Sequence, residues 1–284
     1  MNVPILLWVL SSRGADMVRG TRNIADGREP QAVSTSQRIL LVEGSRFFAN
    51  QVKKQIEAAT GTQIVVAPTL AAAGKAIEAE RGRGGFALAL FDIILPDAAE
   101  TEVVDLCREK GLPSVVFTGF YSDELRERLT SSRTVIDYII KDNPASLTML
   151  RQAVTRIWRN RTTKALAVDD SATARRYLVD LMKLYQFQTL EAANGKQALD
   201  ILHQHPDIKL VVTDYRMPVM DGIDMVKQMR ATHPKDRLAV IGIATGGGSS
   251  LSAQFIKIGA NDFITKPFLR EEFFCRINQN MEII

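Results

Sequence analysis

Short apolar runs alternate with segments of helical period along the second half of the chain. The apolar runs cover residues 165–168, 188–192, 210–213, 238–244 and 262–265. The segments of helical period cover 172–185, 195–204, 222–232, 250–258 and 269–281; in the first of these, Tyr177, Leu178, Leu181 and Leu184 form one apolar stripe. Because runs that are apolar throughout suit strands covered on both faces, the pattern predicts a parallel sheet with helices on each side.

The first half repeats this arrangement. Its predicted strands are 39–42, 63–67, 86–91, 114–117 and 135–140, and its last predicted helix is 145–159. Short matching stretches recur in the same order: Val42 corresponds to Val168, Asp92 to Asp214, Thr118 to Thr245 and Lys141 to Lys266. The repeat predicts a duplicated domain, with copies at 37–160 and 163–284 after a poorly ordered tail of residues 1–36.

Composition adds limits to this picture. The chain has 46% hydrophobic and 24% charged residues and a net charge of +4, as expected of a globular protein with a buried core. Its basic residues are not concentrated in any segment, which argues against nucleic-acid binding. Cys107 and Cys275 are far apart and predict free thiols in a reducing compartment.

The candidate targeting segment is residues 3–10, which is too short to span a bilayer and follows no basic residue. We therefore expect a cytoplasmic protein without a membrane partner, and a signal peptide stays the alternative.

Polar side chains stand where the predicted strands of the second copy end. Asp169 and Asp170 follow the first strand, Asp214 ends the third, Thr245 the fourth and Lys266 the fifth. In a doubly wound sheet, ligands bind at the carboxyl ends of the strands. Carboxylates gathered there repel one another unless a cation lies among them, and Mg²⁺ prefers all-oxygen sites. Such a site suits in-line attack by Asp214 on phosphorus, with Mg²⁺ and Lys266 neutralising the phosphoryl oxygens.

Each residue also has an ordinary structural interpretation. Asp169-Asp170 fits a helix N-cap, Asp214 a turn, Thr245 the opening of a turn and Lys266 a strand exit. Their combination at successive strand ends favours the functional interpretation.

These motifs resemble the receiver domain of bacterial two-component response regulators over residues 38–284. The matching stretches are 168–171, 213–218 with Asp221-Gly222, Thr245, and 266–268. The resemblance implies two flavodoxin-like (βα)5 domains, each an α/β fold with a five-stranded parallel sheet of order 2-1-3-4-5. It implies a histidine kinase or phosphotransfer protein as the phosphodonor.

The resemblance also implies particular roles. Asp170 and Asp214 would bind Mg²⁺ directly with the Arg216 carbonyl, and Asp169 through water. Thr245 and Phe263 would be the switch residues, and Lys266-Pro267 a cis peptide. The run Gly246-Gly247-Gly248 departs from the family and predicts a mobile switch loop.

The first copy departs from the family at the metal position, where Glu43-Gly44 replaces Asp169-Asp170. Asp92, Thr118, Tyr138 and Lys141 are retained. Because glycine offers no side-chain ligand, we expect weakened Mg²⁺ binding, a weak or silent site and a role as an adaptor or dimerisation module.

Three hypotheses describe the output. In the first, the chain is the receiver pair of a regulator whose output domain is absent from it; stretches such as 259–263 and 271–280 resemble receivers that precede diguanylate cyclase (GGDEF) domains, which implies cyclic di-GMP signalling. In the second, it is a stand-alone phosphate sink or binding module. In the third, it is a Mg²⁺-dependent phosphohydrolase with an Asp nucleophile, although residues 214–216 lack the second acid of the usual DxD pattern.

The resemblance to receiver domains also implies a phosphorylation-dependent homodimer through the helix 4, strand 5 and helix 5 face.

Overall fold

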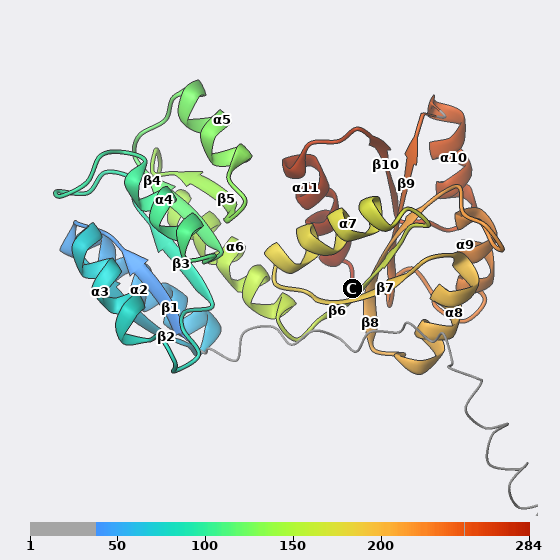
Figure 1. Ribbon diagram of the computed structural model, residues 1–284, viewed down its shortest axis with the longest axis horizontal. Coiled ribbons are helices and arrows are strands. Elements are labelled where there is room, and N and C mark those ends of the chain that lie inside the picture. Colours follow the sequence, from blue (N-terminus) through green and yellow to red (C-terminus); the bar gives the residue numbers. More distant parts are fainter. Residues whose placement is uncertain (1–37, 247) are drawn as a thin grey trace, which may run out of the picture.

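The computed structural model describes residues 38–246 and 248–284, which form two α/β domains (Figure 1). The first domain contains one parallel sheet with strands in the order β2-β1-β3-β4-β5. Its strands are β1 (Arg38–Val42), β2 (Gln63–Ala67), β3 (Leu88–Phe91), β4 (Ser114–Thr118) and β5 (Val135–Ile140). Its helices are α2 (Arg46–Thr60), α3 (Leu70–Ala79), α4 (Glu102–Glu109), α5 (Asp123–Ser131) and α6 (Ser146–Asn160).

The second domain repeats this topology. Its strands are β6 (Lys164–Val168), β7 (Gln188–Ala192), β8 (Ile208–Asp214), β9 (Ala239–Thr245) and β10 (Asp262–Lys266), and their order is β7-β6-β8-β9-β10. Its helices are α7 (Ala172–Leu184), α8 (Gly195–Gln204), α9 (Gly222–Arg230), α10 (Gly248–Ile258) and α11 (Arg270–Met281). Both domains therefore have the flavodoxin-like sheet order 2-1-3-4-5, which confirms the predicted fold.

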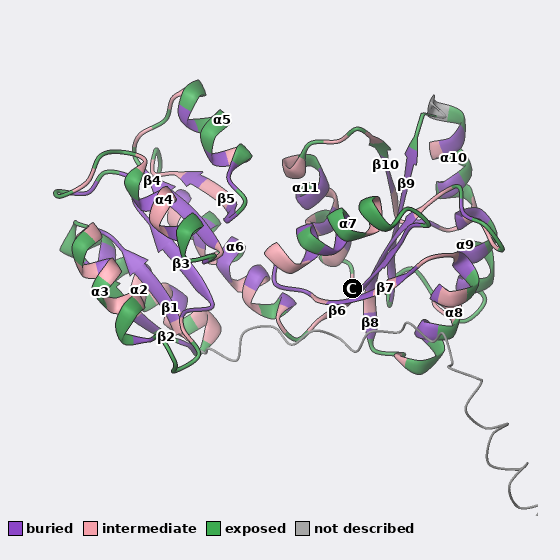
Figure 2. Cartoon of the chain, viewed as in Figure 1, coloured by how far each residue is buried: buried purple, intermediate pink, exposed green. Residues whose placement is uncertain are grey.

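The central strands of each sheet are largely buried on both faces, as their apolar sequences predicted, whereas the edge strands β2, β5, β7 and β10 are only partly buried. Figure 2 shows the central strands buried, while the helices expose their outer sides. The polar Lys209 interrupts the apolar pattern, and the predicted strand therefore started only at residue 210. In the structure β8 begins at Ile208. In β3 the buried Phe86 and Ala87 precede the strand, which begins only at Leu88.

Side-chain hydrogen bonds to main-chain nitrogens cap the first turns of several helices that follow strands. The side chains of Ser45 and Ser171 cap α2 and α7, and Asp221 caps α9 through the main-chain nitrogen of Asp224 at 2.8 Å. Each of these capping residues follows a strand end closely in sequence. The local sequence therefore fixes how each strand turns into its helix at the edge where the polar residues gather.

The two domains are in direct contact. Only residues 161–163 separate α6 from β6, and one cluster of buried apolar side chains includes residues of both domains. Asn160 at the end of α6 donates to the carbonyl of Tyr185 in the second domain at 3.0 Å. Helices α7 and α11 lie on the side of the second domain nearest the first (Figure 1).

The predicted tail of residues 1–36 and its apolar segment 3–10 lie outside the described residues. Within 38–246 and 248–284, no helix is long and apolar enough to cross a membrane.

Candidate functional site

The polar residues singled out in the second half lie at one edge of the second sheet. Asp169 follows β6, Asp214 is the last residue of β8, and Lys266 is the last residue of β10. All neighbouring strands of this sheet are parallel, and β8 lies between β6 and β9. Parallel pairing therefore brings residues from positions about 50 and 100 apart in the sequence to the same edge.

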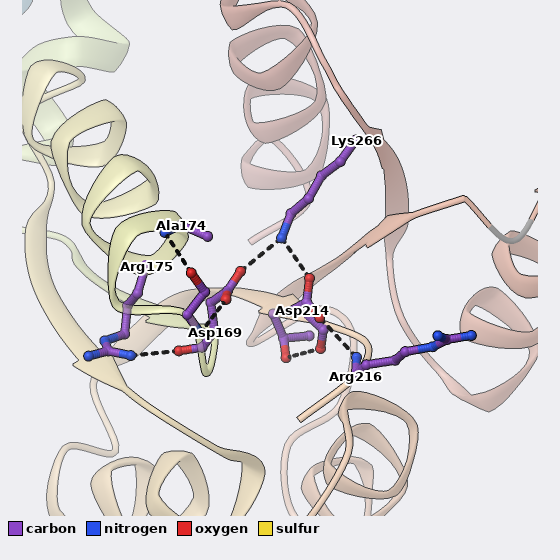
Figure 3. Close-up of polar contacts among 8 residues, drawn as sticks. Asp169, Ala174, Arg175, Asp214, Arg216 and Lys266 are labelled. Atoms are coloured by element: carbon purple, nitrogen blue, oxygen red, sulfur yellow. Dashed lines mark hydrogen bonds and ion pairs between the residues drawn. The ribbon is translucent and has the colours of Figure 1, made fainter. Parts of the chain in front are cut away.

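Lys266 joins the two carboxylates. Its Nζ lies 2.8 Å from Asp169 Oδ2 and 2.6 Å from Asp214 Oδ1, and the side chain points between them in Figure 3. Burial lowers the pKa of Lys266, but the hydrogen bonds and charges of the two aspartates outweigh that effect and raise it above its ordinary value. Lys266 therefore carries a positive charge throughout the physiological pH range.

The other oxygen of each carboxylate accepts a main-chain hydrogen bond. Asp169 Oδ1 accepts from the Ser171 nitrogen and Asp214 Oδ2 from the Arg216 nitrogen, both at 2.9 Å. These bonds hold each carboxylate in one orientation. The Asp214 side chain is 13% exposed, so this acid is reachable from solvent at the sheet edge.

Arg175 of α7 contributes to the site in a way that the sequence analysis missed. Its guanidinium donates to the main-chain oxygen of Asp169 at 2.7 Å (Figure 3). It also pairs with Glu191 of β7 at 3.2 Å. A single arginine on a helix gives no sequence signal for such a contact.

The donor atoms suit a hard cation, although they are not gathered as a ready cluster. Asp170 is exposed, so its carboxylate is open to solvent at the sheet edge. In the described part of the chain, no group of three or more His, Cys, Asp or Glu side chains is placed to hold a metal ion. The Lys266 ammonium occupies the space between Asp169 and Asp214. Three carboxylates at one edge have the donor chemistry that fits Mg²⁺.

The two predicted switch residues lie beside this edge. Thr245 ends β9, pairs in register with Lys266, and is exposed. Phe263 in β10 is buried and packs against Phe255 at 5.3 Å between ring centroids. Gly246 has a φ of +73°, and Gly247 lies outside the described residues. The Lys266-Pro267 peptide is cis.

The corresponding edge of the first sheet holds a similar triad. Lys141 Nζ lies 2.6 Å from Asp92 Oδ2 and 2.6 Å from Glu43 Oε2. The extra methylene of Glu43 thus brings its carboxylate to the lysine. The Lys141 side chain is only 8% exposed, against 22% for Lys266.

Aromatic rings cover this first triad. The Lys141 ammonium lies 5.1 Å from the centroid of Phe48 and 4.9 Å from that of Phe117. A Cβ at Gly44 would meet Pro96 Cδ at 3.3 Å, so little space exists where the second site has Asp170. Lys141 is thus enclosed by carboxylates and rings.

The other retained residues of the first site lie in nearby strands. Thr118 at the end of β4 is fully buried and accepts a hydrogen bond from the Phe120 nitrogen at 3.2 Å. Tyr138 in β5 stacks against Tyr121 at 6.5 Å between ring centroids.

Comparison with known proteins gives consistent similarities. The profile of the response regulator receiver domain matches residues 165–278. The chemotaxis protein CheY homolog of Campylobacter jejuni is 39% identical over 106 residues, which cover 37% of this chain and 82% of that protein. Chemotaxis protein CheY1 of Helicobacter pylori is 40% identical over 106 residues, covering 37% and 86%.

Solved structures extend the similarity to both domains. The crystal structure of a two-component system response regulator/GGDEF domain protein superposes with a TM-score of 0.72 and 37% identity, covering 87% of this chain and 98% of the other. A second structure of a protein of the same description gives a TM-score of 0.70 and 36% identity with the same coverage.

Proposed function

We propose, because this chain belongs to the response regulator receiver domain family of two-component signalling, that Asp214 accepts a phosphoryl group from a histidine kinase or phosphotransfer protein. The observation that carries this proposal is the reachable Asp214 carboxylate, held between a lysine ammonium and a main-chain N–H at the sheet edge. Receiver domains as a family interact with such donors. The second domain is here called receiver 2 and the first receiver 1.

The chemistry is an in-line transfer. The Asp214 carboxylate attacks phosphorus, a new oxygen–phosphorus bond forms, and the bond to the donor's imidazole nitrogen breaks, leaving the imidazole to take a proton. Lys266 lies 2.6 Å from one Asp214 oxygen and supplies a fixed positive charge to the phosphoryl oxygens. Thr245 at the end of β9 is the candidate donor to a phosphoryl oxygen, and Phe263 the aromatic that responds to the change.

The same proposal includes one Mg²⁺ ion. Asp170 and Asp214, with the Arg216 carbonyl, are the proposed direct ligands, and Asp169 is the proposed ligand through water. When bound, the ion neutralises charge on the transferring group. The exposed carboxylate of Asp170 supports this assignment.

The test is labelling of the full chain by radioactive acetyl phosphate with Mg²⁺. We expect one acid-stable, base-labile phosphoryl group, absent from Asp214→Asn, retained in Asp92→Asn and abolished by a chelator of divalent ions. Labelling of Asp214→Asn at the wild-type rate overturns the proposal.

For receiver 1 we propose an adaptor role with a weak or silent site. The reason is that Gly44 offers no side-chain ligand where receiver 2 has Asp170, and that Phe48 and Phe117 cover Lys141. Prompt labelling of Asp92 in Asp214→Asn contradicts this role.

For the output we propose control of a diguanylate cyclase and thus cyclic di-GMP signalling. The support is that both similar solved structures are of proteins described as two-component system response regulator/GGDEF domain proteins. Joining this receiver pair to a GGDEF domain and measuring cyclic di-GMP with and without beryllofluoride tests it; equal synthesis in both conditions contradicts it.

A homodimer through α10, β10 and α11 of receiver 2 belongs to the same proposal. Within the chain, α11 of this face already contacts α5 of receiver 1 through Arg270 and Glu271. Light scattering of wild type and Asp214→Ala, with beryllofluoride and Mg²⁺, tests it: a dimer is expected in wild type alone.

A further inference from the structure

The loop that follows Lys266 is attached to receiver 1. Four positions after Lys266, the guanidinium of Arg270 donates to the main-chain carbonyls of Ser132 and Leu129, the latter at 3.2 Å. These carbonyls belong to the C-terminal end of α5 in the other domain. The residue that begins α11 therefore contacts receiver 1 directly.

The carbonyls at the C-terminal end of α5 favour a positively charged group with several N–H donors, such as the guanidinium of Arg270. The last carbonyls of a helix lack their i+4 partners and carry the negative end of its dipole; the Leu129 carbonyl also accepts from the Ser132 nitrogen at 3.2 Å. The planar guanidinium presents paired N–H groups to two of them. Burial lowers the pKa of Arg270, so the carbonyls of α5 replace solvent around its charge.

A second contact lies beside the first. Glu271 Oε2 accepts from Arg126 of α5 at 3.0 Å. Consecutive residues at the start of α11 are thus held by the same helix of receiver 1.

In the loop between Lys266 and Arg270, Phe268 makes ring contacts, whereas Pro267 and Leu269 are exposed. The Phe268 ring lies 5.6 Å from Phe273 and 6.1 Å from Tyr177, measured between centroids. At the other end of the loop, Lys266 is paired in register with Thr245 and holds Asp214 at 2.6 Å. Residues 267–269 alone separate Arg270 from Lys266, and Phe268 in the middle is held by ring contacts, so a displacement at Arg270 has a short path to Lys266.

We propose that receiver 1 positions the phosphorylation site of receiver 2, with Arg270 and the Arg126–Glu271 pair as positioning residues for Lys266. The inference rests on the proposed function of Asp214. Loosening α5 from α11 frees the loop, so Lys266 spends less time where it neutralises the phosphoryl oxygens. Receiver 1 therefore acts on transfer at Asp214 without taking a phosphoryl group itself.

The experiment measures the rate of labelling by acetyl phosphate and Mg²⁺ in the full chain, below the melting temperature of every variant. Arg126→Glu places a carboxylate against Glu271, and we expect labelling to slow by about 3- to 10-fold. The swapped double variant, Arg126→Glu with Glu271→Arg, restores the opposite charges and is expected to return to within about twofold of wild type. A general loss of stability does not predict that rescue.

Arg128→Glu is the matched control. It makes the same charge change on the same helix, but Arg128 pairs with Asp105 inside receiver 1. We expect its labelling rate to equal that of wild type. Arg270→Ala is expected to be slow, and Arg270→Lys, which keeps the charge at the end of α5, to lie between Arg270→Ala and wild type.

The outcomes separate the two proposals. Absence of label on wild type overturns the proposed function of Asp214. If wild type is labelled, a normal rate in both Arg126→Glu and Arg270→Ala overturns the positioning role, as does equal slowing in Arg128→Glu or failure of the swap to rescue. If Arg126→Glu does not fold, Arg270→Lys and Arg270→Ala decide by the same comparison.

Discussion

Each domain places a lysine ammonium between two carboxylates, yet the two lysines are in different surroundings. Lys141 and Lys266 each lie 2.6 Å from the aspartate at the end of the third strand. Lys141 is covered by Phe48 and Phe117, whereas Lys266 is nearly three times as exposed. The lysine in receiver 2 is therefore the one that an incoming phosphoryl group can reach.

This difference predicts unequal effects of removing the two charges. Lys266→Met is expected to slow acetyl phosphate labelling by roughly 100-fold, because a fixed charge at the transferring group is lost. Lys141→Met is the matched control, and its labelling rate is expected to stay at the wild-type value. Equal rates for Lys266→Met and wild type contradict the role of Lys266.

Asp137 in β5 gives a prediction of pH dependence. It lines a cavity of about 340 Å³ between the domains, and burial raises the pKa of its carboxyl, with Glu271 raising it further and Arg156 opposing. A raised folded-state pKa means that the protonated form favours folding, so the benefit is present below the ordinary pKa and is lost as pH rises through the folded value.

The uncharged variant Asp137→Asn is therefore expected to raise the melting temperature at pH 7. The gain is expected to shrink as pH falls toward the ordinary aspartate pKa, where wild type is itself protonated. Thermal melts of both proteins between pH 4 and 7 provide the measurement, and a gain that is independent of pH contradicts this account.

At the scale of elements, a close approach links the start of α9 to the end of β8. A Cβ on Gly222 would lie 2.3 Å from the main-chain oxygen of Asp214, and the Gly222 nitrogen donates to the carbonyl of Tyr215 at 2.9 Å. The atom that the added Cβ would meet is a main-chain oxygen, so no change of side-chain rotamer can relieve the overlap. Glycine is therefore required for α9 to begin this close to the main chain of Asp214.

Gly222→Ala is expected to lower the free energy of unfolding by about 1–3 kcal/mol and to slow labelling, because Asp214 must shift. Denaturant unfolding and the labelling assay measure the two effects. Gly74→Ala in α3 is the control: nothing lies within 4 Å of its added Cβ. That change is expected to stabilise by roughly 0.5–1 kcal/mol.

At the scale of the whole molecule, the two receivers share a buried core. One apolar cluster contains Ile157 from α6 of receiver 1 and Tyr185 and Phe274 from receiver 2. Tyr185 stacks on Phe274 at 4.3 Å between centroids, and Asn160 of receiver 1 donates to the Tyr185 carbonyl. These contacts couple unfolding of one domain to exposure of apolar surface on the other.

We therefore expect one cooperative thermal transition in calorimetry, with equal calorimetric and van't Hoff enthalpies. Two resolved transitions in wild type contradict the shared core. Asn160→Ala removes the hydrogen bond across the interface and is expected to lower the melting temperature. Asn194→Ala removes the side-chain cap of α8 within receiver 2, and it is the control for the loss of one local hydrogen bond.

The sequence alone determined the sheet and the edge at which the polar residues gather. Apolar runs mark buried strands because strands covered on both faces need apolar side chains throughout, and parallel pairing carries their ends to one side. The sequence therefore predicted that Asp169, Asp214 and Lys266 lie together, and that receiver 1 departs from the family's metal position at Glu43-Gly44. Element bounds were less determined, as the early start of β8 shows.

Only the tertiary structure decided how the two copies act on each other. Arg126 and Glu271 are 145 positions apart, and Arg270 meets main-chain carbonyls, which have no side-chain signature in a sequence. The closeness of Lys141 to Glu43 likewise depends on how far a side chain reaches within a packed edge. Local periodicity records which face of an element is buried, whereas contacts between domains depend on the positions of whole elements, which no short stretch of residues encodes.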